Sequence, residues 1–187
     1  IAESMRVLLF ITASVLAFGS YPVTPIMIVL LAILNDVPIM AIAWDNARTP
    51  REPVRWQMPR VLTVSSVLGV AGVGASFLLF YLIRSYWPEL GLVAGTSQQP
   101  GMALRQTLRT MIFLKLLVAG HMTIYLTRQR SWMWSEPWPS LTLFIPLEAT
   151  QVIGTLFAVY GILMPPIGWL NAAIVWGYAL AWIVALD

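Results

Sequence analysis

Residues 26–44 read IMIVLLAILNDVPIMAIAW, an apolar run interrupted by a single charged residue, Asp36. A transmembrane helix requires about 20 predominantly apolar residues, so this stretch is expected to cross a membrane. The composition of the whole chain agrees, because 59% of its residues are hydrophobic and only 10% are charged. Soluble domains carry about a quarter charged residues. The sequence therefore predicts an integral membrane protein.

Further apolar windows of similar length extend the prediction to most of the chain. They cover residues 61–83, 107–126, 141–163 and 167–186. A sixth run, 5–20, is shorter and lacks a basic leader or a cleavage site, so it is expected to be a helix that has lost its start. The predicted fold is an all-α, polytopic membrane bundle of six transmembrane helices, forming one domain over residues 1–187.

The arginines in the connecting segments indicate orientation. Alternate segments place Arg48, Arg51, Arg55, Arg60, Arg128 and Arg130 on one side of the membrane, and Arg84 and Arg105 on the other. The arginine-rich side is expected to be cytoplasmic, which puts both chain ends in the cytoplasm. Because these arginines flank apolar runs instead of lining a groove with aromatic residues, nucleic acid is not expected as a partner; the lipid bilayer is.

Asp36 is the most informative residue, since intramembrane acids are usually functional. It follows Pro25 by about 11 residues, which places it roughly 16 Å deep, near the midplane. Pro38 has no N–H to donate to the carbonyl of Leu34, so that oxygen becomes available beside Asn35 and Asp36. The alternative is a structural aspartate held by hydrogen bonds, with Pro38 a packing kink.

Arg6 is the expected partner of Asp36. It lies about 14 residues before the turn near Ser20, roughly 5 Å further toward the cytoplasm than Asp36. The short connection predicts that the two helices are antiparallel neighbours, and a long arginine side chain can reach across that distance. We therefore predict an internal Arg6–Asp36 ion pair.

Three other ionisable residues are candidates for accessory roles. Lys115 and Glu148 have estimated depths about 5 Å apart, which predicts a structural salt bridge, with a second proton site at Glu148 as the alternative. His121, the only histidine, could relay protons because its ordinary pKa is near 6.5; the alternative is a satisfied core residue.

A lone carboxyl group favours a proton over a metal ion as the bound species. Divalent cations require about six oxygen ligands, whereas the first two predicted helices hold one midplane acid and an arginine that would repel a cation. The chain has no cysteine, so thiolate metal sites are excluded. No metal site is predicted, and a moving Arg6 could change the proton affinity of Asp36.

Three segments resemble the plasma-membrane proton-pumping P-type ATPases. MIVLLAILNDVPIMAIAWDNARTPREPVRW (27–56) is similar to the sixth transmembrane helix of that family and its following loop. IYLTRQRSWMW (124–134) resembles the end of the eighth helix, and the stretch from QVIGTLFAVYG to IGW (151–169) resembles the ninth helix and its turn. The resemblance implies that residues 1–187 are the C-terminal part of the transmembrane domain, its fifth to tenth helices.

The resemblance also implies roles for individual residues. Asp36 would take up and release the transported proton, Arg6 would be its positive partner, and Asn35 would flank the carboxylate. ATP and Mg²⁺ would bind to cytoplasmic domains that precede this segment, so the segment alone would hydrolyse nothing. Its partners would be those domains, the first four transmembrane helices and protons, in the plasma membrane.

Two features of the sequence depart from the family pattern. The stretch from Arg6 to Asp36 is one residue longer than in plant members, and Lys115 and His121 stand where those members have glutamines.

Two other classes of function stay open: a structural membrane bundle without transport activity, and a small secondary transporter without ATPase activity. A transporter with inverted repeats would show a second interrupted helix, and none is evident.

Overall fold

The computed structural model describes residues 2–46, 58–128 and 138–186, and all regular structure in these ranges is helical. The elements are α1 (Ala2–Phe18), α2 (Pro25–Ala41), the 3₁₀ helix η1 (Ile42–Trp44), α3 (Met58–Leu90), α4 (Pro100–Thr127), α5 (Leu141–Tyr160) and α6 (Gly168–Leu186). The all-α prediction is confirmed, and each predicted apolar window coincides with a helix.

Within the described ranges, five helical segments are long and apolar enough to cross a membrane. They are Pro25–Trp44, which joins α2 to η1, together with Val61–Leu90, Pro100–Thr127, Leu141–Tyr160 and Gly168–Leu186. Helix α1 has 17 residues, slightly fewer than the roughly 20 that a full crossing requires. The loop arginines Arg48, Arg51, Arg55 and Arg130, on which the predicted orientation depends, lie outside the described residues.

Local sequence signals explain where several helices begin and end. Helix α2 starts with Pro25, which needs no hydrogen-bond acceptor for its nitrogen at the first position, and the Thr24 hydroxyl accepts from the backbone N–H of Met27 at 3.4 Å. Ser140 caps α5 in the same way, accepting from Leu143 N–H at 3.2 Å. Helix α5 ends at Gly161, whose φ of 79° is a left-handed conformation that glycine adopts without strain.

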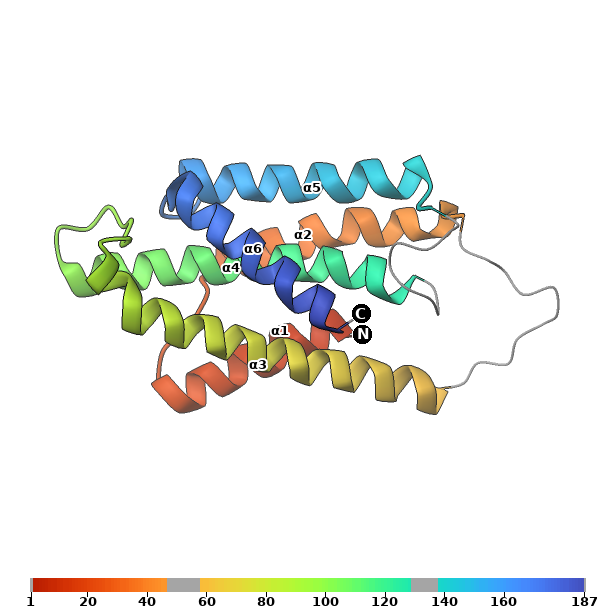
Figure 1. Cartoon of the computed structure of the whole chain (residues 1–187), viewed down its shortest axis with the longest axis horizontal. Helices are drawn as coiled ribbons and strands as arrows, with labels where there is room; N and C mark the ends of the chain where they lie inside the picture. Colours follow the sequence, from red (N-terminus) through yellow and green to blue (C-terminus); the bar gives the residue numbers. More distant parts are fainter. Residues whose placement is uncertain (1, 47–57, 129–137, 187) are drawn as a thin grey trace.

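Helix α4 is the central helix of the bundle (Figure 1). It packs against α1, α2, α3, α5 and α6. In its membrane-crossing window 72% of the residues are buried, compared with 28–44% in the other four segments. A helix that is buried on all sides must carry its polar groups into the protein interior, where each needs a partner. The polar residues of α4 are therefore the ones most constrained by their surroundings.

Helices α1 and α2 are not the packed neighbours that the short connection predicted. Helix α1 packs chiefly against α3, whereas α2 packs against α5 and α4. Aromatic pairs hold α1 on α3, with ring centroids 5.1 Å apart for Phe10 and Phe77 and 4.9 Å apart for Phe18 and Phe80. Figure 1 shows α1 running along α3, whereas α2 runs along α5. A short loop keeps two helix ends together but does not decide which faces pack.

A polar cluster ties three helices together at the end where α2 and α4 terminate and α5 begins. Asp45 Oδ1 accepts from the backbone N–H of Ser140 at 3.0 Å, and Asp45 Oδ2 lies 3.5 Å from Arg128 Nε. The Ser140 and Thr142 hydroxyls donate to the carbonyl of Trp44 at 3.0 and 2.9 Å. This cluster sets the position of the end of α2 relative to α4 and α5.

Candidate functional site

Asp36 lies on the open face of α2. The opposite face of that helix is buried through Met27, Leu31, Leu34, Pro38 and Ala41. Asp36 is exposed, Asn35 beside it is partly buried, and Asp36 makes no hydrogen bond or ion pair with the residues that the structure describes.

The surroundings of Asp36 on this face are apolar. Ile33 and Met40, one turn before and one turn after it, are 56% and 68% exposed. A charged side chain at the centre of a bilayer costs about 2.5–3.5 kcal/mol on the most lenient scale. A carboxylate on such a face is therefore stable in a membrane only if protein or water covers it.

Pro38 does not break α2, which remains α-helical as far as Ala41. It still has no N–H for the carbonyl of Leu34. That carbonyl interacts with the His121 ring of α4. The backbone oxygen that was expected to become available thus interacts with His121, and its residue, Leu34, precedes Asp36 by two positions.

Arg6 does not form the predicted ion pair with Asp36. Its side chain is 4% exposed, pairs with the carboxylate of Glu3 on the same helix, and donates to the Leu116 carbonyl at 3.1 Å. Two facts explain the difference: Glu3 stands three residues before Arg6, a spacing that brings side chains together on a helix, and α1 packs on α3 instead of α2.

Two glycines make room for the Glu3–Arg6 pair. A Cβ atom added at Gly72 of α3 would lie 2.4 Å from Arg6 Cδ, and one added at Gly120 of α4 would lie 2.9 Å from Glu3 Cδ. At such distances, a larger residue at either position would force the side chain of Arg6 or Glu3 to move. The pair is thus enclosed between α1, α3 and α4.

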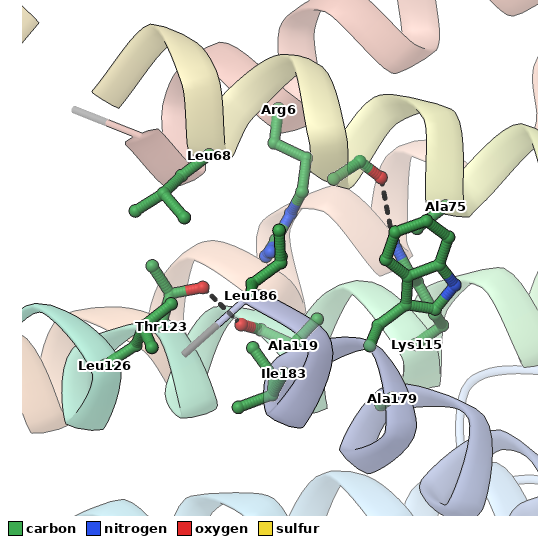
Figure 2. A pocket seen from close by; sticks show the side chains of 12 residues that line it. Arg6, Leu68, Ala75, Lys115, Ala119, Thr123, Leu126, Ala179, Ile183 and Leu186 are labelled. Carbon is green, nitrogen blue, oxygen red and sulfur yellow. Dashed lines mark hydrogen bonds between the residues drawn. The ribbon is translucent and has the colours of Figure 1, made fainter. Parts of the chain in front are cut away.

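Arg6 and Lys115 line the same small cavity between α3, α4 and α6 (Figure 2). Its volume is about 20 Å³, which is enough for a single water molecule. Lys115, which is 1% exposed, donates from Nζ to the Gly72 carbonyl at 3.0 Å and to Ser76 Oγ at 2.6 Å. The Ser76 hydroxyl in turn donates to the same carbonyl at 2.9 Å.

The predicted Lys115–Glu148 salt bridge is therefore wrong for this structure. Lys115 points toward α3, whereas Glu148 Oε1 accepts from the hydroxyl of Tyr125 at 2.9 Å. Lys115 and Tyr125 lie on different faces of α4, since ten residues at about 100° each leave their side chains about 80° apart around the helix axis. Similar depth in the membrane did not bring the two charges together, because their helices turn them in different directions.

We expect the stability of the full protein to couple Lys115 to Ser76 and not to Glu148. Hydrogen bonds to charged groups contribute about 1.5–3 kcal/mol, so Lys115→Met and Ser76→Ala should each destabilise, with a coupling of about 1–2 kcal/mol in the double variant. Chemical unfolding in detergent measures both cycles. The Lys115→Met, Glu148→Gln cycle serves as the control and should be additive; strong coupling there would contradict the observed contacts.

His121 is completely buried between α4, α5 and α2. Its Nδ1 lies 2.8 Å from the Leu117 carbonyl oxygen, and its Nε2 lies 2.8 Å from Thr150 Oγ1 of α5. Both ring nitrogens therefore have hydrogen-bond partners. The side chain is satisfied where it stands, whichever of the two predicted roles it has.

Three residues that complete these contacts were not predicted from the sequence: Glu3, Ser76 and Thr150. The spacing of Glu3 and Arg6 on one helix was a usable signal for their pairing. Ser76 and Thr150 belong to rows of small residues, with Gly72 and Gly154, that by themselves indicate only close helix packing. No sequence signal distinguished their hydroxyls as partners of buried charged or titratable groups.

No group of three or more histidine, aspartate or glutamate side chains converges within residues 2–46, 58–128 and 138–186 in a way that would hold a metal ion. Glu3 is paired with Arg6, and Asp45 is tied to Ser140 and Arg128. Asp36 is thus a single carboxyl group on an open apolar face.

No protein-family model matches the chain. One relative is 44% identical over 187 residues, which is the whole of this chain; it is a protein of Methanocaldococcus jannaschii provisionally named as a cation-transporting ATPase. The chain is similar to part of a transport ATPase. It spans 22% of the length of that relative. The name of the relative does not specify the cation.

Proposed function

We propose that this chain is the C-terminal part of the transmembrane domain of a P-type proton-exporting ATPase, with Asp36 as the group that binds and releases the transported proton. The observation that carries the proposal is the position of Asp36. A lone carboxyl group lies on an open apolar face of a membrane-crossing helix, in a chain that is similar along its whole length to a cation-transporting ATPase.

The open face of α2 supports the assignment to a larger protein. A stand-alone bundle would present the Asp36 carboxylate to lipid, at a cost of several kcal/mol. In the proposal, the first four transmembrane helices cover this face and form the other wall of the proton site. The alternative of a self-sufficient structural bundle or small transporter offers no group among the described residues to cover Asp36.

The chemistry around Asp36 favours a proton as the transported ion. A metal ion requires several oxygen ligands, and the described neighbours of Asp36 on its open face are aliphatic. A carboxyl group binds a proton without further ligands, and its proton affinity responds to burial and to nearby charge. Asn35, partly buried beside it, can hydrogen-bond either form of the carboxyl group.

Arg6 has a conditional part in the proposal. In the present structure it is paired with Glu3. A positive charge that approaches Asp36 in another conformation would favour proton release. Glu3 would then hold Arg6 away from the carboxyl group in the state described here.

Energy would come from outside this chain. In the proposal, ATP and Mg²⁺ bind to cytoplasmic domains of the same polypeptide, and phosphorylation there drives the helices between states of different proton affinity. This chain contributes the transport path and no hydrolytic group. The proposal is tested by measuring ATP-driven proton movement in vesicles by the full protein and by its Asp36→Asn variant.

The proposed orientation puts the protein in the plasma membrane with the ends of α2 and α4 in the cytoplasm. A cysteine introduced at Gln98, an exposed position before α4, should react with an impermeant thiol reagent added outside intact cells. A cysteine at Thr127, exposed at the other end of α4, should react only after permeabilisation. Labelling of Thr127→Cys but not Gln98→Cys in intact cells would reverse the topology.

A further inference from the structure

His121 occupies an unusual position for a buried histidine because its two nitrogens face partners of different kinds. The Leu117 carbonyl, 2.8 Å from Nδ1, can only accept a hydrogen bond, so Nδ1 must carry a proton. The Thr150 hydroxyl, 2.8 Å from Nε2, can either donate or accept. The protonation state of Nε2 therefore depends on what the hydroxyl does.

The Thr150 hydroxyl has alternative acceptors within its own helix. Its Oγ1 lies 2.8 Å from the Pro146 carbonyl oxygen and 3.0 Å from the Leu147 carbonyl oxygen. It has one proton to donate, which can point either at Nε2 or at these carbonyls. In the first arrangement Nε2 accepts and the ring is neutral; in the second Nε2 donates and the ring is charged.

The site therefore satisfies both protonation states of His121 with the heavy atoms where they are. Taking up a proton at Nε2 requires only that the Thr150 hydroxyl rotate toward α5 carbonyls. A buried polar group that loses its partner on titration would cost about 1–3 kcal/mol. That penalty is absent here, because every hydrogen-bonding atom of the ring keeps a partner in both states.

The charged groups near the ring come from several helices. Glu3 and Arg6 of α1 act on it electrostatically, and the Glu3 carboxylate lies against Gly120, the residue before His121. On α5, Glu148 is engaged by Tyr125; on α4 itself, Lys115 points to α3; on α2, Asp36 is on the open face. The Leu34 carbonyl adds a negative dipole end.

We propose that His121 is a second proton-binding site of this protein, with Thr150 as the hydroxyl that reverses its hydrogen bond when the proton arrives. Binding of the proton itself does not depend on the transport activity. Its coupling to Asp36 rests on the proposed function: the Leu34 carbonyl, which interacts with the ring, precedes Asp36 by two residues on α2. A charge on His121 strengthens that contact and so biases the position of the helix that carries Asp36.

Nitrogen NMR of the histidine rings in the full protein, reconstituted in lipid vesicles and labelled with ¹⁵N-histidine, tests the site directly. The His121 signals are identified by their loss in His121→Gln. We expect Nδ1 to remain protonated while Nε2 gains a proton as the pH is lowered within the range where the protein stays folded. An Nε2 that keeps one protonation state across that range would overturn the proposal.

Two variants of Thr150 separate the hydroxyl from the packing. Thr150→Ser keeps the hydroxyl and should titrate close to the wild type. Thr150→Val keeps the shape but removes the hydroxyl that accepts from Nε2 of the charged ring, and we expect a proton affinity about tenfold lower, which is a midpoint lower by about one pH unit. Equal midpoints in the two variants would contradict the role of the hydroxyl.

The transport assay tests the coupling separately. In vesicles, the wild type should show a step in the pH profile of ATP-driven proton movement at the midpoint measured by NMR. The His121→Gln variant, which retains Asp36, should lack this step. A profile that keeps this step would refute the coupling. Absence of proton movement in the wild type would refute the proposed function instead, and the NMR titration would still decide whether His121 binds a proton.

Discussion

Replacing Asp36 with Asn in the full protein is expected to abolish ATP-driven proton transport, a loss of at least about a hundredfold, while phosphorylation by ATP persists. The amide keeps the size of the side chain but cannot release a proton in the range where a carboxyl group does. The reason for the size of the effect is that Asp36 stands alone: no other carboxylate among the described residues lies on the open face of α2.

The matched control is Glu89→Gln, which neutralises an exposed acid near the end of α3, away from the proposed path. It should transport at the wild-type rate. Reconstituted vesicles with an internal pH indicator measure proton movement, and radiolabelled ATP measures phosphorylation. Normal proton flux in Asp36→Asn would refute the proposed function, and flux that requires added Na⁺, K⁺ or Ca²⁺ would show a metal cation to be the substrate.

Replacing Arg6 with Met is expected to lower the free energy of unfolding by roughly 3 kcal/mol. Removing one member of a buried ion pair leaves the other charge without compensation, which costs about 3–5 kcal/mol; the lower end applies because Glu3 is 21% exposed. The variant also loses the hydrogen bond from Arg6 to the Leu116 carbonyl. The loss should appear in chemical unfolding of the full protein in detergent.

The double variant Glu3→Gln, Arg6→Met distinguishes the ion pair from a simple packing effect. Since it removes both charges together, it should recover a large part of the lost stability. If the double variant is as unstable as Arg6→Met alone, the Glu3–Arg6 pair is not what makes Arg6 important. If the double variant is instead stable but has lost transport completely, that loss would support a direct effect of Arg6 on Asp36.

The helices could be predicted closely because membrane insertion depends on local composition. A run of about 20 apolar residues satisfies its backbone hydrogen bonds within itself, so each window indicates a helix regardless of its neighbours. Residues 141–163 and 167–186, for example, were expected as separate helices and appear as α5 and α6, with the turn placed by Gly161. Prolines and glycines in the sequence mark these ends directly.

The ion pairs could not be predicted, because they depend on which helix faces meet. Depth along the membrane can be estimated from residue counts, and it suggested Arg6 with Asp36 and Lys115 with Glu148. The observed partners are Glu3 for Arg6 and Ser76 for Lys115. Each alternative lies within reach of a long side chain, so the packing of α1 on α3 and the rotation of α4 selected the partner.

From the sequence alone, this chain could be recognised as an all-helical bundle with segments long and apolar enough to cross a membrane, and Asp36 as a carboxyl group inside one apolar run. Both conclusions follow from the length and composition of the apolar runs. The packing of the helices was needed to show that Asp36 faces outward from the described bundle, while Arg6, Lys115 and His121 face inward to other partners. The reason is physical: apolar composition specifies insertion along the membrane normal, whereas the rotation and pairing of helices depend on side-chain packing between residues far apart in the chain.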